Sequence, residues 1–262
     1  MTNVLEELAS AAKRRVEESK RTVPLEEIRA KALAMPCDTG FPFERALRRN
    51  GIQFICECKK ASPSKGLISP DFPYLDIARE YEEAGAACIS VLTEPTRFLG
   101  DDRYLKGISS TVGIPCIRKD FIVDEYMIYE AKTLGASAVL LICSLLTQEE
   151  LERFFRTADS LGMSALFEAH DEREVRMAMA AHARIIGVNN RDLRDFTVDL
   201  GNCIGLRSKV PADVIFVAES GISTPEDVSR LRDAGVDAVL IGETLMRSAD
   251  KKKALDTLRG MI

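Results

Sequence analysis

The sequence comprises 262 residues, of which 46% are hydrophobic and 29% are charged, with a formal net charge of −5 and an isoelectric point near 5.4. This length suffices for one large domain or two small ones, and the mild acidity excludes the basic field that draws proteins to nucleic acid or to an anionic membrane. No apolar run approaches the roughly 18 residues that a membrane-spanning helix needs.

The first 48 residues predict a helical extension rather than a separate domain. Residues 1–21 are charged and amphipathic and lack the apolar segment of a secretory signal peptide, which favours a cytoplasmic protein. Residues 16–35 have a helical pattern, with Pro24 near a helix start. We therefore expect a single domain over residues 1–262, in which residues 1–48 pack against the rest.

Eight apolar, β-branched runs follow, and they are typical of buried parallel strands because they are continuous rather than alternating. They lie at 52–58, 86–92, 114–119, 137–143, 164–169, 184–189, 214–220 and 237–243. Helical patterns separate most of them, with Thr147 and Thr224 at two expected N-caps. Four of these helices end in a glycine at the left-handed cap position, within 71–85, 123–135, 147–162 and 224–235.

This repeated unit of helix, glycine and buried strand predicts an α/β fold, a (β/α)₈ TIM barrel with the N-terminal helices added. A doubly wound open sheet is the alternative. The Gly-x-Gly-x-x-Gly motif usual after its first strand is absent, which counts against it.

Polar side chains stand at the carboxyl ends of most of these strands, where a parallel barrel carries its active site. Glu57 and Lys59 are two residues apart, so strand geometry points both the same way. Each such residue alone is usually a solvated rim or cap residue, and the Glu57–Lys59 pair alone could be a rim ion pair. Because so many of them fall at the same end of the predicted barrel, a functional site is favoured. The residues at this end are Glu57, Lys59, Lys119, Phe121, Glu168, His170, Asn189, Arg191, 218–221 and 241–243.

A phosphorylated ligand is indicated at the same end. Residues 62–66 supply hydroxyls, turn residues and Lys65, while Gly221 and Gly242 follow the seventh and eighth strands and allow close backbone approach. Phosphate sites after these two strands, with a helix N-terminus, recur in barrels. Each dipeptide is a weak signal alone, and its position on these strands gives it weight.

The seven cysteines form no Cys-x-x-Cys pair and lie mostly in apolar runs, which is typical of buried thiols in a reducing compartment. The two histidines, His170 and His182, are too few for a histidine-rich metal site. We expect no metal.

Six motifs, spread over almost the whole chain, stand out: CKKASPSKGLI, ACISVLTEPTRFLG, IRKDFIVDEYMIYEAKTLGASAVLLI, IGVNNRDL, VAESGI and AVLIGETLMR. Together they resemble the indole-3-glycerol phosphate synthase family. The resemblance implies a cofactor-independent lyase of tryptophan biosynthesis. Its substrate would be the sugar phosphate 1-(2-carboxyphenylamino)-1-deoxyribulose 5-phosphate, and its products indole-3-glycerol phosphate, CO₂ and water.

The resemblance also implies residue roles, carried over motif by motif. Lys119 would be the general acid for the substrate's carbonyl oxygen, Lys59 would face the substrate's carboxylate, and the division of the acid role in dehydration between the two lysines is left open. Glu168 would be the base in dehydration, and Glu57 would hold the lysines in register. The other matched positions are Asn189 and Ser220 as catalytic, Arg191, Glu219 and Phe121 as substrate-binding, and Ser62, Gly221, Gly242 and the backbone N–H of Glu243 as phosphate-binding.

Three further expectations concern the site residues and their surroundings. Burial should lower the pKa of Lys119 so that it can give up a proton near neutral pH. Cys56, Cys58 and Arg118 alternate with the site residues and should point away from the mouth. The loop after the first strand, with Gly66, could act as a lid.

Two other functions stay open from the residues alone. A phosphoribosylanthranilate isomerase-like barrel would use a cysteine base near the end of the first strand, for which Cys58 is the candidate. A non-catalytic barrel that binds a phosphometabolite would not need Lys119 and Glu168 together. We expect a small-molecule partner, no nucleic acid or membrane, and either a monomer or association with other tryptophan-pathway enzymes.

Overall fold

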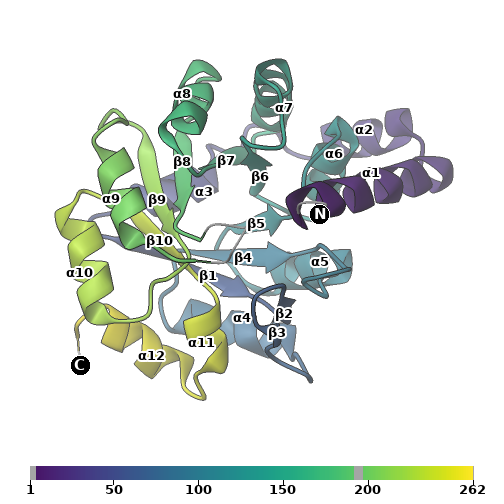
Figure 1. Ribbon diagram of the computed structural model, residues 1–262. Coiled ribbons are helices and arrows are strands. Elements are labelled where there is room, and N and C mark those ends of the chain that lie inside the picture. The colour runs from purple at the N-terminus through teal and green to yellow at the C-terminus, as the bar shows by residue number, and fades with distance from the viewer. Residues whose placement is uncertain (1–3, 192–196, 262) are drawn as a thin grey trace.

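The computed structural model describes residues 4–191 and 197–261, and its backbone forms a closed barrel of eight parallel strands with helices outside (Figure 1). The first strand closes the cylinder, since Gln53 pairs with Ala238 on one side and Ile55 with Cys88 on the other. The (β/α)₈ barrel is confirmed and the open sheet is excluded. The barrel strands are β1 (Gln53–Cys58), β4 (Cys88–Leu92), β5 (Cys116–Lys119), β6 (Ala138–Ile142), β7 (Ser164–Ala169), β8 (Ile185–Asn189), β9 (Ile215–Glu219) and β10 (Ala238–Ile241).

Capping residues mark the ends of several outer helices. Thr147 and Thr224 each form a capping box with the residue three positions on. The expected glycine caps have positive φ, between 69° and 86°. The outer helices are α4 (Tyr74–Glu83), α5 (Asp102–Thr111), α6 (Glu125–Thr133), α7 (Gln148–Ser160), α8 (Glu172–Ala180), α9 (Leu200–Arg207), α10 (Pro225–Asp233), α11 (Glu243–Arg247) and α12 (Lys251–Leu258).

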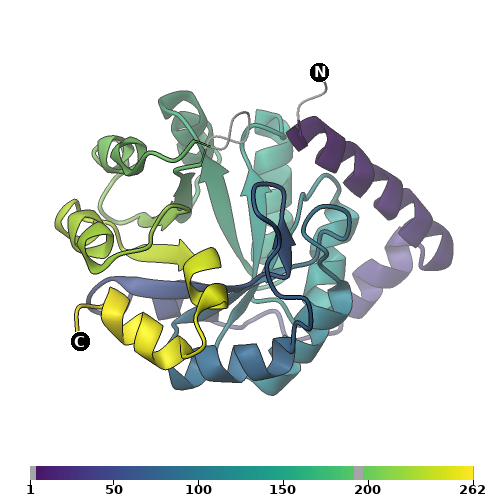
Figure 2. The ribbon, with the colours of Figure 1, turned by 60° about the horizontal axis from the view of Figure 1, so that its bottom comes forward.

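The N-terminal extension forms three helices, α1 (Val4–Thr22), α2 (Leu25–Leu33) and α3 (Pro42–Leu47). Figure 2 shows α1 and α2 along one side of the barrel, where α2 packs against α6. Helix α3 supplies Phe43 and Leu47 to the apolar cluster inside the barrel. The extension therefore braces one flank and closes the amino end, which leaves the carboxyl end as the mouth.

Alternate residues of each strand face opposite layers, as the strand period requires. Ile55 lies in the cluster inside the barrel, whereas Cys56 and Cys58 lie in the cluster between barrel and helices. Arg118 also points outward, with Nη2 2.8 Å from Asp102 and Nη1 2.7 Å from Glu130. The three expectations of outward-facing side chains are confirmed.

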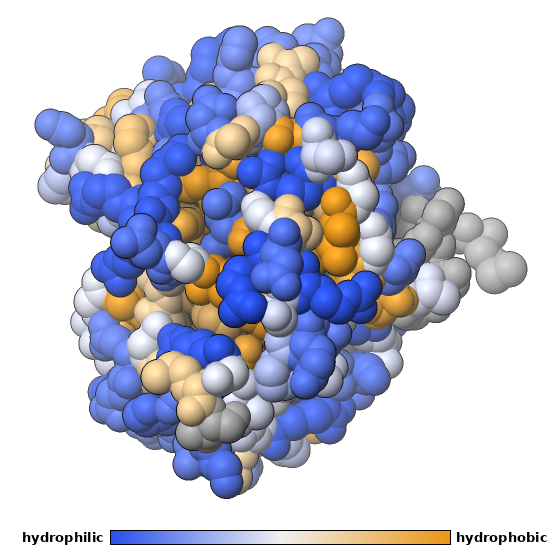
Figure 3. All heavy atoms as spheres, turned by 90° about the vertical axis from the view of Figure 1, so that its left-hand side faces the viewer, coloured by the Kyte–Doolittle hydropathy of each residue, from blue (hydrophilic) through white to orange (hydrophobic). Residues whose placement is uncertain are grey.

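A short antiparallel hairpin, β2 (Ala61–Ser62) and β3 (Gly66–Leu67), follows β1 and stands beside the mouth (Figure 2). The face drawn in Figure 3 is mostly hydrophilic, with apolar atoms showing mainly in recesses. Among the described residues, no helix combines the length and apolarity needed to cross a bilayer. Most large apolar side chains are thus used in the two core layers.

Candidate active site

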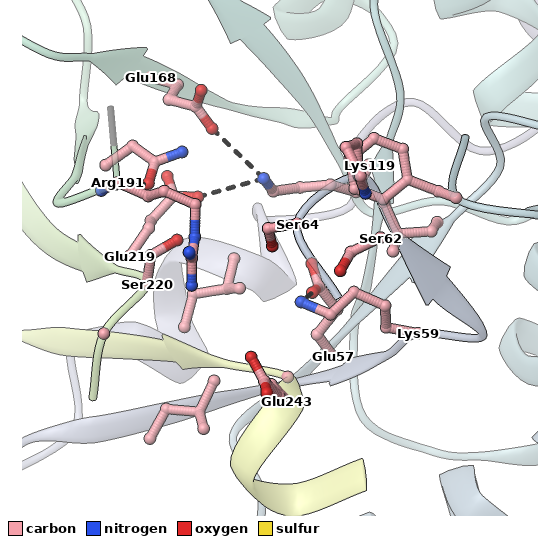
Figure 4. A pocket seen from close by; sticks show the side chains of 18 of the residues that line it. Glu57, Lys59, Ser62, Ser64, Lys119, Glu168, Arg191, Glu219, Ser220 and Glu243 are labelled. Carbon is pink, nitrogen blue, oxygen red and sulfur yellow. Dashed lines mark hydrogen bonds and ion pairs between the residues drawn. The ribbon is translucent and has the colours of Figure 1, made fainter. Parts of the chain in front are cut away.

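A cavity of about 370 Å³ opens at the carboxyl ends of the strands. Figure 4 shows charged side chains from several strands pointing into it. The thirteen residues to which the resemblance gives roles all line this cavity, namely Glu57, Lys59, Ser62, Lys119, Phe121, Glu168, Asn189, Arg191, Glu219, Ser220, Gly221, Gly242 and Glu243. His170 does not line it, although it too follows a barrel strand.

Lys119 lies between two carboxylates on the cavity floor. Its Nζ is 3.3 Å from Oε2 of Glu168 and 3.2 Å from Oε2 of Glu219 (Figure 4). Lys119 and Glu219 are the last residues of β5 and β9, and Glu168 is the last but one of β7, so the closed barrel brings the three together from alternate strands. Both carboxylates are almost fully buried, at 2% and 1% exposure. Burial makes each contact electrostatically strong because little water screens it.

A second ion pair lies across the cavity, at the end of β1. Lys59 Nζ is 2.8 Å from Oε1 of Glu57, and Ser90 Oγ donates a hydrogen bond of 3.3 Å to Oε2 of the same carboxylate. Burial alone would raise the pKa of Glu57, but Lys59 and Lys119 outweigh it and hold that pKa below its usual value. Glu57 is therefore ionised and electrostatically linked to both lysines.

The expected lowering of the Lys119 pKa is wrong for the free protein. Burial does favour the neutral amine, but the charges of Glu219, Glu168 and Glu57 together raise the Lys119 pKa above its ordinary value. Lys119 is thus a reliable cation and a weak acid until a ligand separates it from its partners. Three carboxylates from other strands cause this, and none is a sequence neighbour.

The two carboxylates beside Lys119 differ in their protonation. Burial raises the pKa of Glu219 to about 7. Lys119 acts to lower this pKa, but the nearby charge of Glu168 opposes that effect. Burial acts on Glu168 as well, but Lys119 and His170 hold its pKa below the usual value. Apart from the ion pair of Oε2 with Lys119, neither oxygen of Glu219 has a hydrogen-bond partner among the described residues. Glu219 is thus the carboxyl group that takes up a proton near neutral pH.

Glu219 should give the stability of the fold a pH dependence of defined sign. A carboxyl group with a raised folded-state pKa stabilises the folded protein below its unfolded pKa and loses this effect as pH rises through the folded pKa. As pH rises from 4.5 to about 7, the free energy of unfolding of a Glu219→Gln variant should increase relative to that of the wild type, by an amount on the order of 1–3 kcal/mol. Urea denaturation of both proteins across this range checks it, and a difference that is constant or falls contradicts it.

One wall of the cavity is apolar and was largely missed by sequence reasoning. Phe121 was expected there, and its ring centre lies 6.2 Å from that of Phe98. Val4, Leu5 and Leu8 of α1 also line the cavity. Their spacing on α1 indicates an apolar face. The neighbouring sequence gives no sign that this face covers catalytic side chains more than a hundred residues further along the chain. The wall can hold a planar aromatic group.

The opposite wall is made of small residues and turns at the ends of β9 and β10. Ser220 and Gly221 have φ values of 66° and 77°. A Cβ on Gly242 would lie 2.6 Å from Oε1 of Glu57 and 2.9 Å from Nζ of Lys59, so only glycine leaves room for that pair. The Glu243 carboxylate is 3.6 Å from Lys65 and 3.2 Å from Arg247. Its side chain is therefore engaged, and its backbone remains for a ligand.

Among the residues in the described ranges, no group of three His, Cys, Asp or Glu side chains is placed to hold a metal ion. The lining of the cavity instead offers two ammonium groups, two guanidinium groups, five carboxyl groups, an apolar wall and a wall of hydroxyls and close-approach backbone. This arrangement suits proton transfers on a ligand that is aromatic at one end and anionic at the other.

The family model and the similar proteins that match this chain carry the same description. The family model described as "Indole-3-glycerol phosphate synthase" matches residues 5–258. Three similar proteins bear this same name. That of Ruminiclostridium cellulolyticum is 54% identical over 98% of this chain and 99% of its own. The protein of Lachnoclostridium phytofermentans is 50% identical over 99% of this chain and 100% of its own. The protein of Endomicrobium trichonymphae is 52% identical over 98% of this chain and 99% of its own.

Solved structures resemble the fold at much lower identity. A 3-hexulose-6-phosphate synthase has a TM-score of 0.65 at 14% identity, covering 80% of this chain and 100% of its own. Thiamine phosphate pyrophosphorylase from Pyrococcus furiosus has a TM-score of 0.60 at 18% identity, covering 82% and 96%. At such identities the similarity concerns the barrel alone.

Proposed function

The chain belongs to the indole-3-glycerol phosphate synthase family, and on that premise we propose which of its cavity residues carry which step. It is a decarboxylating lyase that converts 1-(2-carboxyphenylamino)-1-deoxyribulose 5-phosphate into indole-3-glycerol phosphate, CO₂ and water in tryptophan biosynthesis. The observation that carries the assignment of roles is the position of Lys119 between two carboxylates, opposite the Glu57–Lys59 pair.

In ring closure, the aromatic carbon that bears the carboxylate bonds to the ketone carbon of the sugar. Lys119 gives its proton to the ketone oxygen, which becomes a hydroxyl, while positive charge develops on the ring and its nitrogen. Glu57 stabilises this charge, since Lys59 keeps its carboxylate ionised. The reacting carbons are held together by the apolar wall at Phe121 at one end and the phosphate wall at the other.

Loss of CO₂ then returns the electron pair of the broken bond to the ring and restores aromaticity. Lys59, beside the departing carboxylate, holds the substrate in place through this step. Dehydration follows, in which Glu168 takes a proton from the ring carbon next to nitrogen while the hydroxyl leaves as water with a proton from a lysine. An acid and a base on opposite sides of the intermediate are required. Lys119 lies beside Glu168 in the free protein and must move from it to act as that acid, whereas Lys59 already lies across the cavity.

The remaining residues serve binding. Asn189 and Ser220 contact the reacting part of the substrate, while Arg191 and Glu219 contact its polar groups. Ser62, Gly221, Gly242 and the backbone N–H of Glu243 hold the phosphate. The substrate is the only partner these residues call for, and the extension and barrel act as one domain over residues 1–262 in the cytoplasm, as a monomer or with other enzymes of the pathway.

The purified protein should generate indole fluorescence when given 1-(2-carboxyphenylamino)-1-deoxyribulose 5-phosphate, with no added metal or cofactor. The isomerase-like alternative loses its base, because Cys58 is buried between barrel and helices and burial raises its pKa well above the usual value. Turnover of phosphoribosylanthranilate in place of this substrate would restore that alternative. Saturable binding of the substrate without turnover would favour the non-catalytic barrel.

A further inference from the structure

His170 directly follows β7, two residues after Glu168. Residues of α8 and α9 hold it in place. Its Nδ1 is 3.3 Å from Oε2 of Glu174 on α8, and the same oxygen accepts a 2.9 Å hydrogen bond from the His170 backbone N–H. Asn202 of α9 donates to the His170 carbonyl oxygen at 3.0 Å. The orientation of the imidazole ring is thus fixed by α8 and α9.

The other ring nitrogen points at Glu168. His170 Nε2 lies 3.8 Å from Oε1 of Glu168, just beyond hydrogen-bond distance. This nitrogen is buried and has no hydrogen-bond partner among the residues that the structure describes. The two oxygens of Glu168 therefore face different groups, Oε2 the ammonium of Lys119 and Oε1 the imidazole of His170.

Lys119 cannot stay with Glu168 throughout the reaction. To protonate the ketone oxygen it must turn toward the substrate and give up a proton, which takes away the cation that pairs with Glu168. The Asn189 side chain still hydrogen-bonds to Glu168, but a buried carboxylate that loses its neighbouring cation is strongly disfavoured. Glu168 would then take up a proton early and could not serve as a base in the later dehydration.

This inference rests on the proposed function. We propose that His170 is a positioning residue for Glu168: clamped by Glu174, its imidazolium donates Nε2–H to the Glu168 carboxylate once Lys119 has turned to the substrate. A shift of about 1 Å converts the present approach into a hydrogen bond. Glu168 thereby stays ionised and oriented until dehydration.

The protonation state of the ring decides whether this contact can form. Glu174 accepts at Nδ1, so the neutral ring keeps its proton there and turns a lone pair toward Glu168, while only the imidazolium donates at both nitrogens. Burial lowers the pKa of His170, but Glu174, Glu168 and Glu219 outweigh it and raise that pKa above the ordinary value. Lys119 from β5 is the cation that faces the same Glu168 carboxylate, and Arg173 lies 3.9 Å from Glu174.

The chain has only two histidines, so imidazole titration by NMR can be followed one residue at a time. We expect His170 to titrate above the ordinary histidine pKa in the wild type and at a lower pH in a Glu174→Gln variant. His182, which is exposed just beyond the end of α8, provides the reference signal in both spectra. Equal His170 titration in the two proteins would show that Glu174 does not clamp the ring and would overturn the proposal.

Kinetics provide the second arm. A His170→Asn variant should lose about 10-fold or more in kcat with little change in KM, as expected for one hydrogen bond to a charged group. The fall of wild-type kcat at the pH where His170 loses its proton should be absent from it. The matched control is His182→Asn, since φ at His182 is 60° and asparagine tolerates that conformation; its kcat and pH profile should equal those of the wild type.

A His170→Asn variant with unchanged kcat and pH profile overturns the positioning role while leaving the proposed function intact. Absence of turnover in the wild type overturns the proposed function instead, so the two failures are distinct. If His170→Asn does not fold, His170→Gln and Glu174→Gln carry the same kinetic test, since each weakens the clamp in a different partner.

Discussion

A Lys119→Met variant is expected to fold and to lose roughly 10²–10⁴-fold in kcat, the usual contribution of a positioned general acid. Methionine fills a similar volume but can neither donate a proton nor carry charge. Ring closure needs an acid at this point of the cavity in the proposed mechanism, and dehydration needs one from Lys119 or Lys59. The loss should appear in CO₂ release as well as in indole formation, because ring closure precedes both.

The folding of this variant can be argued from the same cavity. Removing one member of a buried ion pair typically costs about 3–5 kcal/mol because the other charge stays behind. Here the charge left behind can be neutralised, since burial already raises the pKa of Glu219 to about 7. In the absence of Lys119, Glu168 and Glu219 can share a proton at neutral pH, which limits the loss of stability.

A Lys119→Arg variant separates the acid role from the charge. Arginine keeps the cation beside Glu168 and Glu219 but does not give up its proton near neutral pH. We expect it to unfold at a denaturant concentration close to that of the wild type and still to lose most of its kcat. Lys13→Met, on the exposed face of α1, is the surface control. Turnover by Lys119→Arg within about 10-fold of the wild type would assign the role of acid to another group.

The raised pKa of Lys119 fits this role only if binding changes its surroundings. A general acid works best with a pKa near the operating pH, and three carboxylates keep Lys119 well above that in the free protein. Protonation of Glu219 removes one of these charges, and turning toward the substrate weakens the contact with Glu168. Substrate binding can therefore bring the acid into range, which couples binding to proton transfer.

The barrel and the thirteen cavity residues could be predicted because both depend on short-range rules. Strand period 2 decides that Lys119 points in and Arg118 points out, and parallel connections bring every strand end to one mouth. The wall from Val4, Leu5 and Leu8 could not, since it depends on how α1 packs across the barrel. The Lys119 pKa could not either, because it depends on distances to carboxylates on three other strands.

A Glu168→Gln variant is expected to separate the two halves of the reaction. Glutamine keeps the shape of the side chain and an oxygen that can accept from Lys119, but it cannot act as a base. If Glu168 serves only dehydration, ring closure and CO₂ release proceed in the first turnover while indole formation falls roughly 10²–10⁴-fold. Rapid-quench measurement of CO₂ beside indole fluorescence should then show about one CO₂ per enzyme before any comparable rise in indole.

The relation between the two signals decides what Glu168 does. Equal loss of CO₂ and indole would mean that Glu168 acts before decarboxylation, by holding Lys119 in place for ring closure. Wild-type rates of both would remove it from the reaction. Glu172→Gln on the exposed side of α8 is the matched control, since the Glu172 carboxylate pairs with Arg176 at the surface and its loss should change neither signal. Only the delayed indole signal agrees with a base that is kept ionised while Lys119 serves the substrate.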